Sequence, residues 1–268
     1  MTPAARPDRP HRLLGRWRFE TYETLGSTND HCIALAEAGE KEGLAVMARR
    51  QTGARGSRGR SWSEPPAGNL ALSVLLRPAA MQEPGLWPFV AGLALHDGLE
   101  QVSGAALLLK WPNDVLLGDR KLAGILIERG VGPDGHWMVI GFGANLAAAP
   151  VLADRIAACL ADAGPPPAQE EAAEAVLAAL DRWCAVFERD GFAPIREAWL
   201  TRAHPIGARL RAALPAASGR DALANRPPVE QREGSFGGIA ADGALLLEWS
   251  GRLWRIETGE VLLLGDGR

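Results

Sequence analysis

Short, strongly apolar runs alternate along the chain with longer stretches whose apolar residues recur every three or four positions. The first pattern is typical of buried strands and the second of amphipathic helices. The apolar runs predict strands at 16–25, 44–51, 69–78, 106–111, 114–129 and 136–146, the fifth folded into a hairpin. Helical spacing predicts helices at 26–39, 84–102, 170–191 and 192–204, with a shorter one within 149–170. This order of elements predicts an α+β fold, a mixed sheet with flanking helices.

The pattern changes near residue 204. From there, short apolar runs are broken by glycines, and the turns "ADG" and "SG" mark hairpins typical of a small β-barrel. Residues 215–233 are predicted to be a long loop. We therefore expect three parts, a flexible tail over 1–12, a main domain over 13–204 and a C-terminal barrel over 205–268.

Composition places the chain among ordinary globular proteins. Its 268 residues are 47% hydrophobic and 23% charged, with a net charge of −3 and a pI near 6.0. A slightly acidic protein is not expected to bind nucleic acid through its overall charge. No apolar run is long enough to cross a membrane and the first residues lack an apolar signal core, so we expect a cytoplasmic protein. The three cysteines are predicted to be buried thiols, since they indicate neither a disulfide framework nor a zinc site.

Residues 49–62, "RRQTGARGSRGRSW", form a loop rich in arginine and glycine. Glycines let a ligand approach the backbone, and guanidinium groups bind phosphate or carboxylate oxygens. The loop therefore favours a small anion such as a nucleotide, although neither a P-loop nor a dinucleotide motif is present. A solvated basic loop without a ligand is the alternative.

Lysine is scarce, and only Lys41, Lys110 and Lys121 interrupt a chain that otherwise uses arginine. Two of them fall close together in "KWPND" and "RKLAG". An ammonium group enters tight sites that a guanidinium cannot, so both lysines are candidate ligand contacts. The alternatives are turn chemistry at "KWPND" and an ordinary exposed strand lysine at Lys121.

Together these residues predict one pocket that contains many cations and one free carboxylate, Asp114. Asn145 is expected to add an amide group to the same pocket. The five histidines are scattered and predicted to be structural, no Ser-His-Asp order occurs, and no dedicated metal cluster is expected. Such a site suits chemistry on anions, including the joining of a carboxylate to a nucleotide phosphate.

Five motifs in order, "GSTND", "QTGARGSRGRSW", "KWPNDV", "RKLAGILIE" and "IGFGANL", followed by "GGIAADGALLLEW", resemble those of biotin protein ligases over about residues 17–264. The resemblance implies a catalytic domain of the class II synthetase-like biotin/lipoate ligase fold and a C-terminal SH3-like β-barrel. It also implies a carbon–nitrogen ligase that uses ATP with Mg²⁺ to convert biotin to biotinyl-5′-AMP. A lysine of a biotin carboxyl carrier domain, as in acetyl-CoA carboxylase, would then receive the biotin.

The resemblance also assigns roles to residues. The catalytic candidates are Lys121, Asp114, Arg55 and Arg58, with Lys121 bridging the biotin carboxylate and the phosphate and Asp114 orienting or deprotonating the incoming lysine. Biotin contacts are expected from Ser27, Thr28, Asn29, Gln51, Arg55, Gly56, Ser57, Lys121 and Gly124. Nucleotide contacts are expected from Arg58, Arg60, Trp62, Lys110, Asn113 and Asn145.

Two departures from the family pattern carry further expectations. The usual loop is G-R-G-R-x-G-R, and here Ala54 replaces the first glycine and Ser57 replaces an arginine. Because loss of that arginine in the family is associated with poorer retention of the adenylate, we expect a leakier intermediate. Only about 16 residues precede the first strand of the resemblance, too few for the DNA-binding domain of bifunctional members, so we expect no operator binding.

Two other functions stay open from sequence. A lipoate or octanoate ligase shares the catalytic fold, and a non-catalytic protein could bind biotin or nucleotide, or RNA through the arginine loop. The presence of both Lys121 and Asp114 favours an enzyme, because binding alone needs neither. The oligomeric state, a homodimer included, is not legible from the chain.

Overall fold

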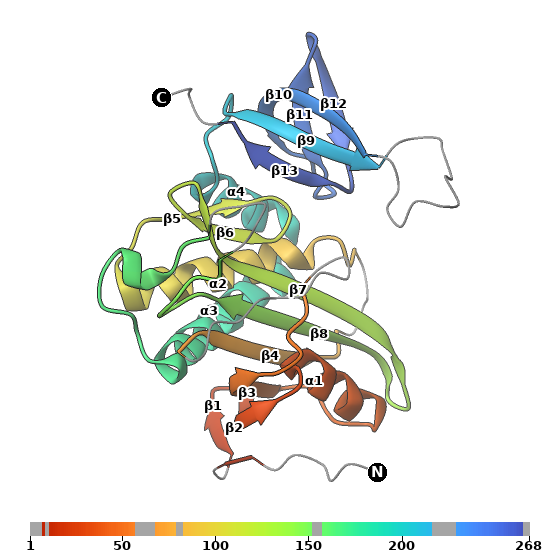
Figure 1. The fold of residues 1–268 in the computed structure, drawn as a ribbon. Helices are drawn as coiled ribbons and strands as arrows, with labels where there is room; N and C mark the ends of the chain where they lie inside the picture. Colours follow the sequence, from red (N-terminus) through yellow and green to blue (C-terminus); the bar gives the residue numbers. More distant parts are fainter. Residues whose placement is uncertain are drawn as a thin grey trace, which may run out of the picture.

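The computed structural model of this protein describes residues 7–8, 11–56, 68–78, 83–151, 157–215 and 229–264. These residues form a mixed eight-stranded sheet, four α-helices and a separate five-stranded antiparallel sheet (Figure 1). The strands of the large sheet are β1 (Arg12–Leu14), β2 (Trp17–Leu25), β3 (Leu44–Gln51), β4 (Leu70–Leu76), β5 (Leu107–Lys110), β6 (Asp114–Leu117), β7 (Arg120–Gly132) and β8 (Gly135–Ala144). The helices are α1 (Thr28–Glu37), α2 (Trp87–Ser103), α3 (Gln169–Asp190) and α4 (Phe192–Arg202). The predicted α+β class is thereby confirmed.

The large sheet has the strand order β1-β2-β3-β4-β8-β7-β6-β5. Strands β2 and β3 are parallel and joined through α1, while the remaining neighbours are antiparallel. This order brings β3, β4, β8 and β7 side by side, although β3 and β8 are about ninety residues apart along the sequence. The centre of the sheet is therefore built from segments that are far apart in the sequence, and the local sequence pattern does not predict that they are neighbours.

Helices cover both faces of the sheet. In β3, Ala45 and Met47 join the core shared with α2 and α3, whereas Val46 and Ala48 pack with Cys32 of α1 on the opposite face. All seven residues of β4 are buried as a result. A strand buried on both faces reads as a continuous apolar run rather than an alternating one, which is the pattern over 69–78.

The N-terminus of α1 is capped by the residue that precedes it. The Ser27 side chain accepts a hydrogen bond from the Asp30 amide, and Asp30 occupies the first turn. Gly39, with φ of 90°, follows the helix and donates to the carbonyl of Ala36. The short helix expected within 149–170 is a single 3₁₀ turn at Leu160–Asp162, preceded by residues outside the described ranges.

The C-terminal sheet contains β9 (Arg209–Pro215), β10 (Val229–Ile239), β11 (Leu245–Trp249), β12 (Arg252–Ile256) and β13 (Glu260–Leu263). Its order, β12-β11-β10-β9-β13, is compatible with the small barrel that the resemblance implies. The loop predicted over 215–233 is too long, because β10 begins at Val229 and pairs with β9. Residues 216–228 lie outside the described residues. Since α4 ends at Arg202 and β9 begins at Arg209, the architecture changes between them, and the domain limits themselves stay predictions.

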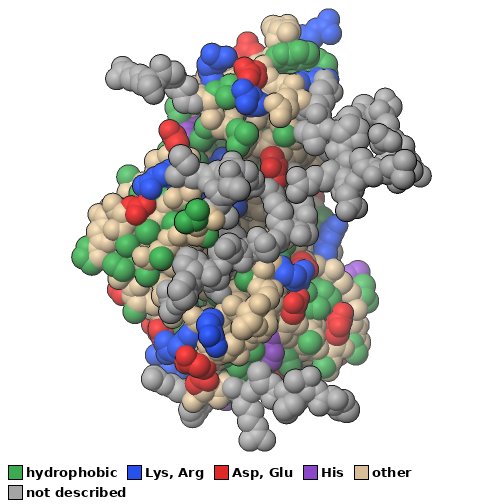
Figure 2. Space-filling model, in the orientation of Figure 1, with side chains coloured by type: hydrophobic (Ala, Val, Ile, Leu, Met, Phe, Trp, Pro, Cys, Tyr) green, Lys and Arg blue, Asp and Glu red, His purple; other side chains and the backbone are tan. Residues whose placement is uncertain are grey.

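Cys32, Cys159 and Cys184 are buried free thiols, as predicted. Within the described residues no helix has the length and apolar character needed to span a membrane. On the face seen in Figure 2, acidic and basic side chains are interspersed rather than gathered by sign. That distribution agrees with a protein whose arginines serve local contacts.

We expect Gly98→Ala to destabilise the protein by roughly 1–3 kcal/mol, because a Cβ at Gly98 of α2 would lie 2.7 Å from the Val176 backbone of α3. Helix propensity alone would give the opposite sign, about 1 kcal/mol of stabilisation. Urea-induced unfolding measures the difference. Gly164→Ala, where the added methyl meets nothing within 4 Å, is the matched control. Equal stability of the two variants would contradict close helix packing at this point.

Candidate functional site

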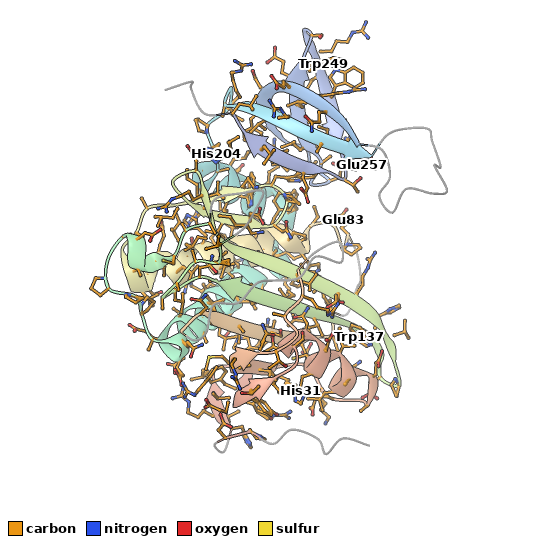
Figure 3. All side chains as sticks on the ribbon, in the orientation of Figure 1. His31, Glu83, Trp137, His204, Trp249 and Glu257 are labelled. Carbon is orange, nitrogen blue, oxygen red and sulfur yellow. The ribbon has the colours of Figure 1, made fainter. Side chains whose placement is uncertain are left out.

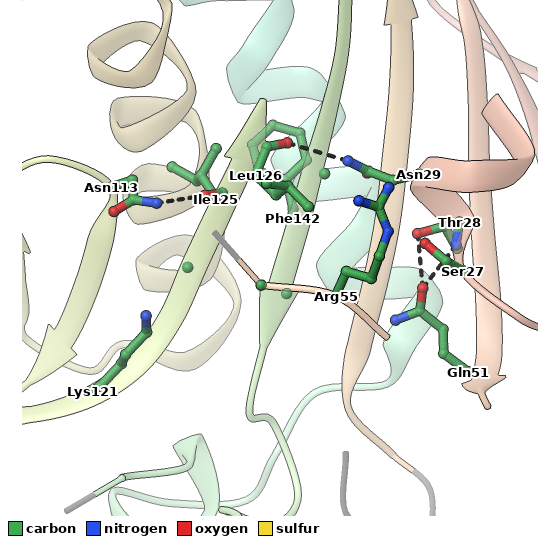
Figure 4. A pocket seen from close by; sticks show the side chains of 14 residues that line it. Ser27, Thr28, Asn29, Gln51, Arg55, Asn113, Lys121, Ile125, Leu126 and Phe142 are labelled. Carbon is green, nitrogen blue, oxygen red and sulfur yellow. Dashed lines mark hydrogen bonds between the residues drawn. The ribbon is translucent and has the colours of Figure 1, made fainter. Parts of the chain in front are cut away.

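A pocket opens where the N-terminus of α1 and the end of β3 meet the start of β6, the first half of β7 and the last residues of β8 (Figure 4). Its lining residues are Ser27, Thr28, Asn29, Gln51, Arg55, Gly56, Asn113, Lys121, Gly124, Ile125, Leu126, Gly141, Phe142 and Gly143. The structure thus brings together nine residues that the sequence predicted from four separate motifs. Polar side chains of α1 and β3 lie at one end and Lys121 lies at the other.

The polar end is organised by the first turn of α1. Gln51, the last residue of β3, accepts a hydrogen bond through its Oε1 from the backbone amide of Thr28 at 2.8 Å. The same oxygen lies 3.2 Å from Thr28 Oγ1. Ser27 and Thr28 are about 5% exposed or less. The helix cap therefore also forms a wall of the pocket, which explains the S-T-N stretch at a helix start.

Asn29 continues this polar wall into the sheet. Its Nδ2 donates to Glu128 Oε2 of β7 at 2.9 Å, and its Oδ1 lies 2.6 Å from Ser73 Oγ of β4. Ser73 Oγ is also 2.7 Å from Thr28 Oγ1. Room for Asn29 comes from Gly141 of β8, where a Cβ would lie 2.1 Å from Asn29 Oδ1. Glycine at 141 is thus required by the side chain that packs over it.

Arg55 is held by two carboxylates. Its guanidinium donates to both oxygens of Glu128, at 3.0 Å and 2.8 Å, and pairs with Asp30 as well. The hydrogen bond with Glu128 is the largest cause that raises the pKa of Arg55. The sequence predicted Arg55 as a biotin contact and a catalytic candidate, and both of these acidic partners were missed.

Lys121 and Lys110 share one carboxylate at the other end. Lys121 Nζ is 2.5 Å from Asp114 Oδ1, and Lys110 Nζ is 3.0 Å from Asp114 Oδ2. Burial opposes ionisation of Asp114, but the two ammonium groups outweigh burial and hold the pKa of this carboxyl below its ordinary value. The expectation of a free carboxylate is therefore wrong. Asp114 on β6 is the shared counter-charge of the two lysines, which lie on the neighbouring strands β5 and β7.

The nucleotide-side candidates are only partly together. Asn113 lines the pocket and donates to the Ile125 carbonyl at 2.7 Å. Lys110 lies behind Asp114 and donates to the Val261 carbonyl of the C-terminal sheet at 3.3 Å. Asn145 is 1% exposed and donates to the Ala158 carbonyl, while its buried Oδ1 has no hydrogen-bond partner in the described part of the chain. Neither Lys110 nor Asn145 lines the pocket itself. Four predicted site residues, Ser57, Arg58, Arg60 and Trp62, lie outside the described residues.

Some lining and supporting residues were missed by sequence reasoning. They are Asp30, Ser73, Ile125, Leu126, Glu128, Gly141, Phe142 and Gly143. Ser73 did carry a signal, because it is a polar residue inside an otherwise apolar strand run, whereas Glu128 stands at the end of such a run, next to Arg129. Their partners could not be found without the strand order.

The histidines are scattered, as predicted. His96 is buried and bonds to the Leu107 carbonyl and Asp97, and His31 contacts Tyr22. Figure 3 shows His31, which belongs to α1, far from His204, which lies beside the C-terminal sheet. Among the residues that the structure describes, no group of three or more His, Cys, Asp or Glu is arranged to hold a metal ion.

Comparison with known proteins finds relatives over most of the chain. Residues 23–145 match the biotin/lipoate A/B protein ligase family model. The chain is 38% identical over 255 residues to a biotin–[acetyl-CoA-carboxylase] ligase of Paracoccus denitrificans, covering 89% of this chain and 98% of the relative. It is 33% identical over 253 residues to the bifunctional ligase/repressor BirA of Escherichia coli, covering 89% and 72%.

A solved biotin protein ligase of Aquifex aeolicus, in complex with biotin and ATP, has a similar fold. Its TM-score is 0.74 at 24% identity, with 92% of this chain and 98% of that chain covered. At this identity the likeness supports the fold, including the C-terminal sheet.

We expect Asp114→Asn to destabilise the protein by about 3 kcal/mol at pH 7, because two partly buried ammonium groups lose their shared counter-charge. The folded-state pKa of Asp114 is lowered, so its contribution is fully present above about pH 4, the ordinary aspartate range, and is lost as pH falls through the folded-state value. Urea unfolding at pH 7, 5 and 3 measures this. Asp119→Asn, in the exposed neighbouring turn, is the control. A difference that persisted undiminished at pH 3 would refute the ionic explanation.

Proposed function

The chain belongs to the biotin protein ligase family, and from that premise we propose that it activates biotin with ATP and transfers it to a lysine of a biotin carboxyl carrier domain. It is a ligase that forms a carbon–nitrogen bond. The acceptor is the carrier domain of acetyl-CoA carboxylase or of a similar biotin-dependent enzyme. Biotin, ATP and the carrier are thus its three substrates.

One observation carries the proposal, which is that a single pocket has a hydrogen-bonding end, where Glu128 and Asp30 neutralise the Arg55 guanidinium, and a cationic end at Lys121. Biotin has the matching distribution, a neutral ureido ring that exchanges hydrogen bonds and a carboxylate on an aliphatic chain. The ring would occupy the end formed by Thr28, Asn29 and Gln51, and the carboxylate would reach Lys121. Ile125, Leu126 and Phe142 supply apolar surface between the ends.

The first step joins the biotin carboxylate to the α-phosphorus of ATP. A carboxylate oxygen forms the new bond to phosphorus, the bond between the α- and β-phosphates breaks, and pyrophosphate leaves. Negative charge on both reactants would repel them in a water-poor pocket. Lys121 reduces this repulsion because a fixed ammonium stabilises the charge that develops between carboxylate and phosphate.

The second step forms the amide. The carrier lysine amine attacks the acyl carbon of biotinyl-5′-AMP, the carbon–oxygen bond to phosphate breaks, and AMP leaves with one proton lost from the amine. Asp114 is a weak base for that proton, because two lysines hold its pKa low and an efficient base titrates near the working pH. We therefore assign Asp114 to holding Lys121 and Lys110 in position, in preference to deprotonating the amine.

The nucleotide would lie beyond Lys121. Asn113 and Asn145 offer amide oxygens, and the Asn145 Oδ1 is buried without a partner among the described residues, as a position that awaits a ligand would be. Mg²⁺ prefers such oxygens and enters with ATP, whose phosphates it partly neutralises. Arg58, Arg60 and Trp62 remain proposed contacts of the phosphates and adenine.

A lipoate or octanoate ligase is the nearest alternative. The polar end of the pocket favours biotin, because neither a dithiolane ring nor an alkyl chain exchanges hydrogen bonds with Thr28, Asn29 and Gln51. A protein that only binds biotin or nucleotide would not need Lys121 to be paired with Asp114 and Lys110. ATP–pyrophosphate exchange that depends on biotin separates the enzyme from the binding protein.

We expect Lys121→Met to lower carrier biotinylation by roughly 10²–10³-fold, because the transition state loses a preorganised cation. The assay uses MgATP, an isolated biotin carboxyl carrier domain and either biotin or lipoate, and reads the intact mass of the carrier. Lys41→Met, at the exposed third lysine, is the matched control. A lipoate-sized gain would overturn the substrate, and full activity of the Lys121 variant would overturn the site.

We expect the protein to release free biotinyl-5′-AMP faster than its Ser57→Arg variant, which restores the family's arginine. The physical reason is that an additional guanidinium binds the adenylate phosphate through charge-assisted hydrogen bonds. Filter retention of radiolabelled adenylate in the absence of carrier measures the release. Identical release from both proteins would show that Ser57 is not the cause of any leak.

A further inference from the structure

Asp114 lies between two lysines whose surroundings differ. Lys121 lines the pocket (Figure 4), whereas Lys110 does not line it and donates a hydrogen bond to the Val261 carbonyl of the C-terminal sheet at 3.3 Å. Lys121 Nζ contacts Oδ1 of the carboxylate, and Lys110 Nζ contacts Oδ2. The side chains are 10% exposed for Asp114, 16% for Lys110 and 21% for Lys121. Any effect of Lys110 on a ligand in the pocket is therefore exerted without contact.

We propose that Lys110 is a positioning residue that neutralises the Asp114 carboxylate and thereby keeps the Lys121 ammonium available for the carboxylate of biotin. This inference rests on the proposed function and deepens it, since it concerns how the cationic end of the pocket recognises its ligand. It differs from the nucleotide contact that the resemblance implies for Lys110. A residue outside the pocket thus governs the affinity of the pocket for a carboxylate.

Strand pairing fixes Lys110 beside Asp114. The two residues lie directly opposite each other in the β5–β6 pair, and side chains at opposed positions leave the sheet on the same face. Their charged groups meet at 3.0 Å, and the Val261 carbonyl accepts a hydrogen bond from the same ammonium group. Held by these two acceptors, Lys110 stays next to Asp114 whether or not Lys121 contacts a ligand.

Two ammonium groups share the charge of one carboxylate in this cluster. Burial raises the pKa of Asp114, but Lys121 and Lys110 each lower it and together outweigh burial, so both lysines interact with the ionised carboxylate. The two ammonium groups also repel each other, which weakens the hold of Asp114 on Lys121. Lys121 is therefore attracted to Asp114 less strongly than it would be in a simple ion pair.

Loss of Lys110 would change what a ligand carboxylate meets in the pocket. Asp114 would then have Lys121 as the remaining ammonium group of the cluster, and the biotin carboxylate would have to compete with Asp114 for that group. A neutral ligand of the same shape would meet no such competition. The difference arises at Asp114, so it does not depend on the other contacts of Lys121. Lys110 is thus expected to matter for a carboxylate and not for its neutral analogue.

Lys110→Met tests this expectation, because methionine removes the ammonium group and keeps an apolar chain. We expect the affinity for biotin, measured by calorimetry without ATP, to fall about tenfold or more. The affinity for biotin carboxamide, in which a neutral amide replaces the carboxylate, should stay within about twofold and thereby show that the variant is folded. Lys41→Met removes the same charge from an exposed position and is the matched control. Lys110→Gln takes the place of Lys110→Met if the latter does not fold.

A second substitution separates this role from a merely structural one. The double variant Lys110→Met/Asp114→Asn also removes the carboxylate that competes for Lys121. Its biotin affinity should therefore recover to within about threefold of the wild type, although two charged groups have been removed. A double variant that binds biotin no better than Lys110→Met would overturn the proposal, because a structural loss is not restored by a further one.

The outcomes distinguish the two levels of inference. A wild-type protein that binds no biotin would overturn the proposed function and this inference with it. Normal binding by the wild type, with an equal loss for biotin and its carboxamide in Lys110→Met, would overturn only the role of Lys110. Unchanged biotin affinity in that variant would do the same, and a raised Michaelis constant for ATP would then assign Lys110 to the nucleotide. A selective loss that the second substitution restores would establish the role.

Discussion

Burial of the large sheet on both faces is the constraint on which the rest of the structure depends. With α1 on one face and α2 to α4 on the other, the central strand β4 is wholly buried, and a polar side chain on it must find a partner inside the protein. Ser73 is the clearest case, a hydroxyl at the centre of a wholly buried strand. Its partners come from α1, which is why the cap of that helix and the pocket wall are the same residues. The site therefore follows from the need to satisfy polar groups in the core.

The charged groups obey the same constraint. Arg55 and Lys121, the two described cations that line the pocket, both have acidic partners. Arg55 is held by Glu128 and Asp30, and Lys121 shares Asp114 with Lys110. A buried charge without such a partner would cost several kcal/mol. The pocket can therefore be formed before any ligand arrives, and it gives an anionic ligand a positive end without leaving an isolated charge in the protein.

The parts of this arrangement that depend on local pattern could be predicted from sequence, and the parts that depend on strand order could not. The strands at 44–51 and 69–78, the helix within 26–39 and the candidate Lys121 follow from apolar runs, helical spacing and the scarcity of lysine. Glu128 lies 99 residues from Asn29, and only the order β4-β8-β7 brings them together. The early start of β10 at Val229, within the loop predicted over 215–233, was missed for a related reason, since its polar first residues are held by pairing with β9 rather than by an apolar core.

The shared carboxylate also explains how Lys121 can exchange partners. When a ligand carboxylate reaches Lys121, Asp114 would lose one of two ammonium groups and keep the other, because Lys110 is bound to its second oxygen and anchored to the Val261 carbonyl. A carboxylate with only one lysine would be left buried and unpaired by the same movement. Lys110 thus lowers the cost of releasing Lys121, which gives a reason for two lysines in a chain that uses arginine almost everywhere else. Since Lys110 is tied to the C-terminal sheet, that sheet contributes to the charge balance of the pocket without lining it.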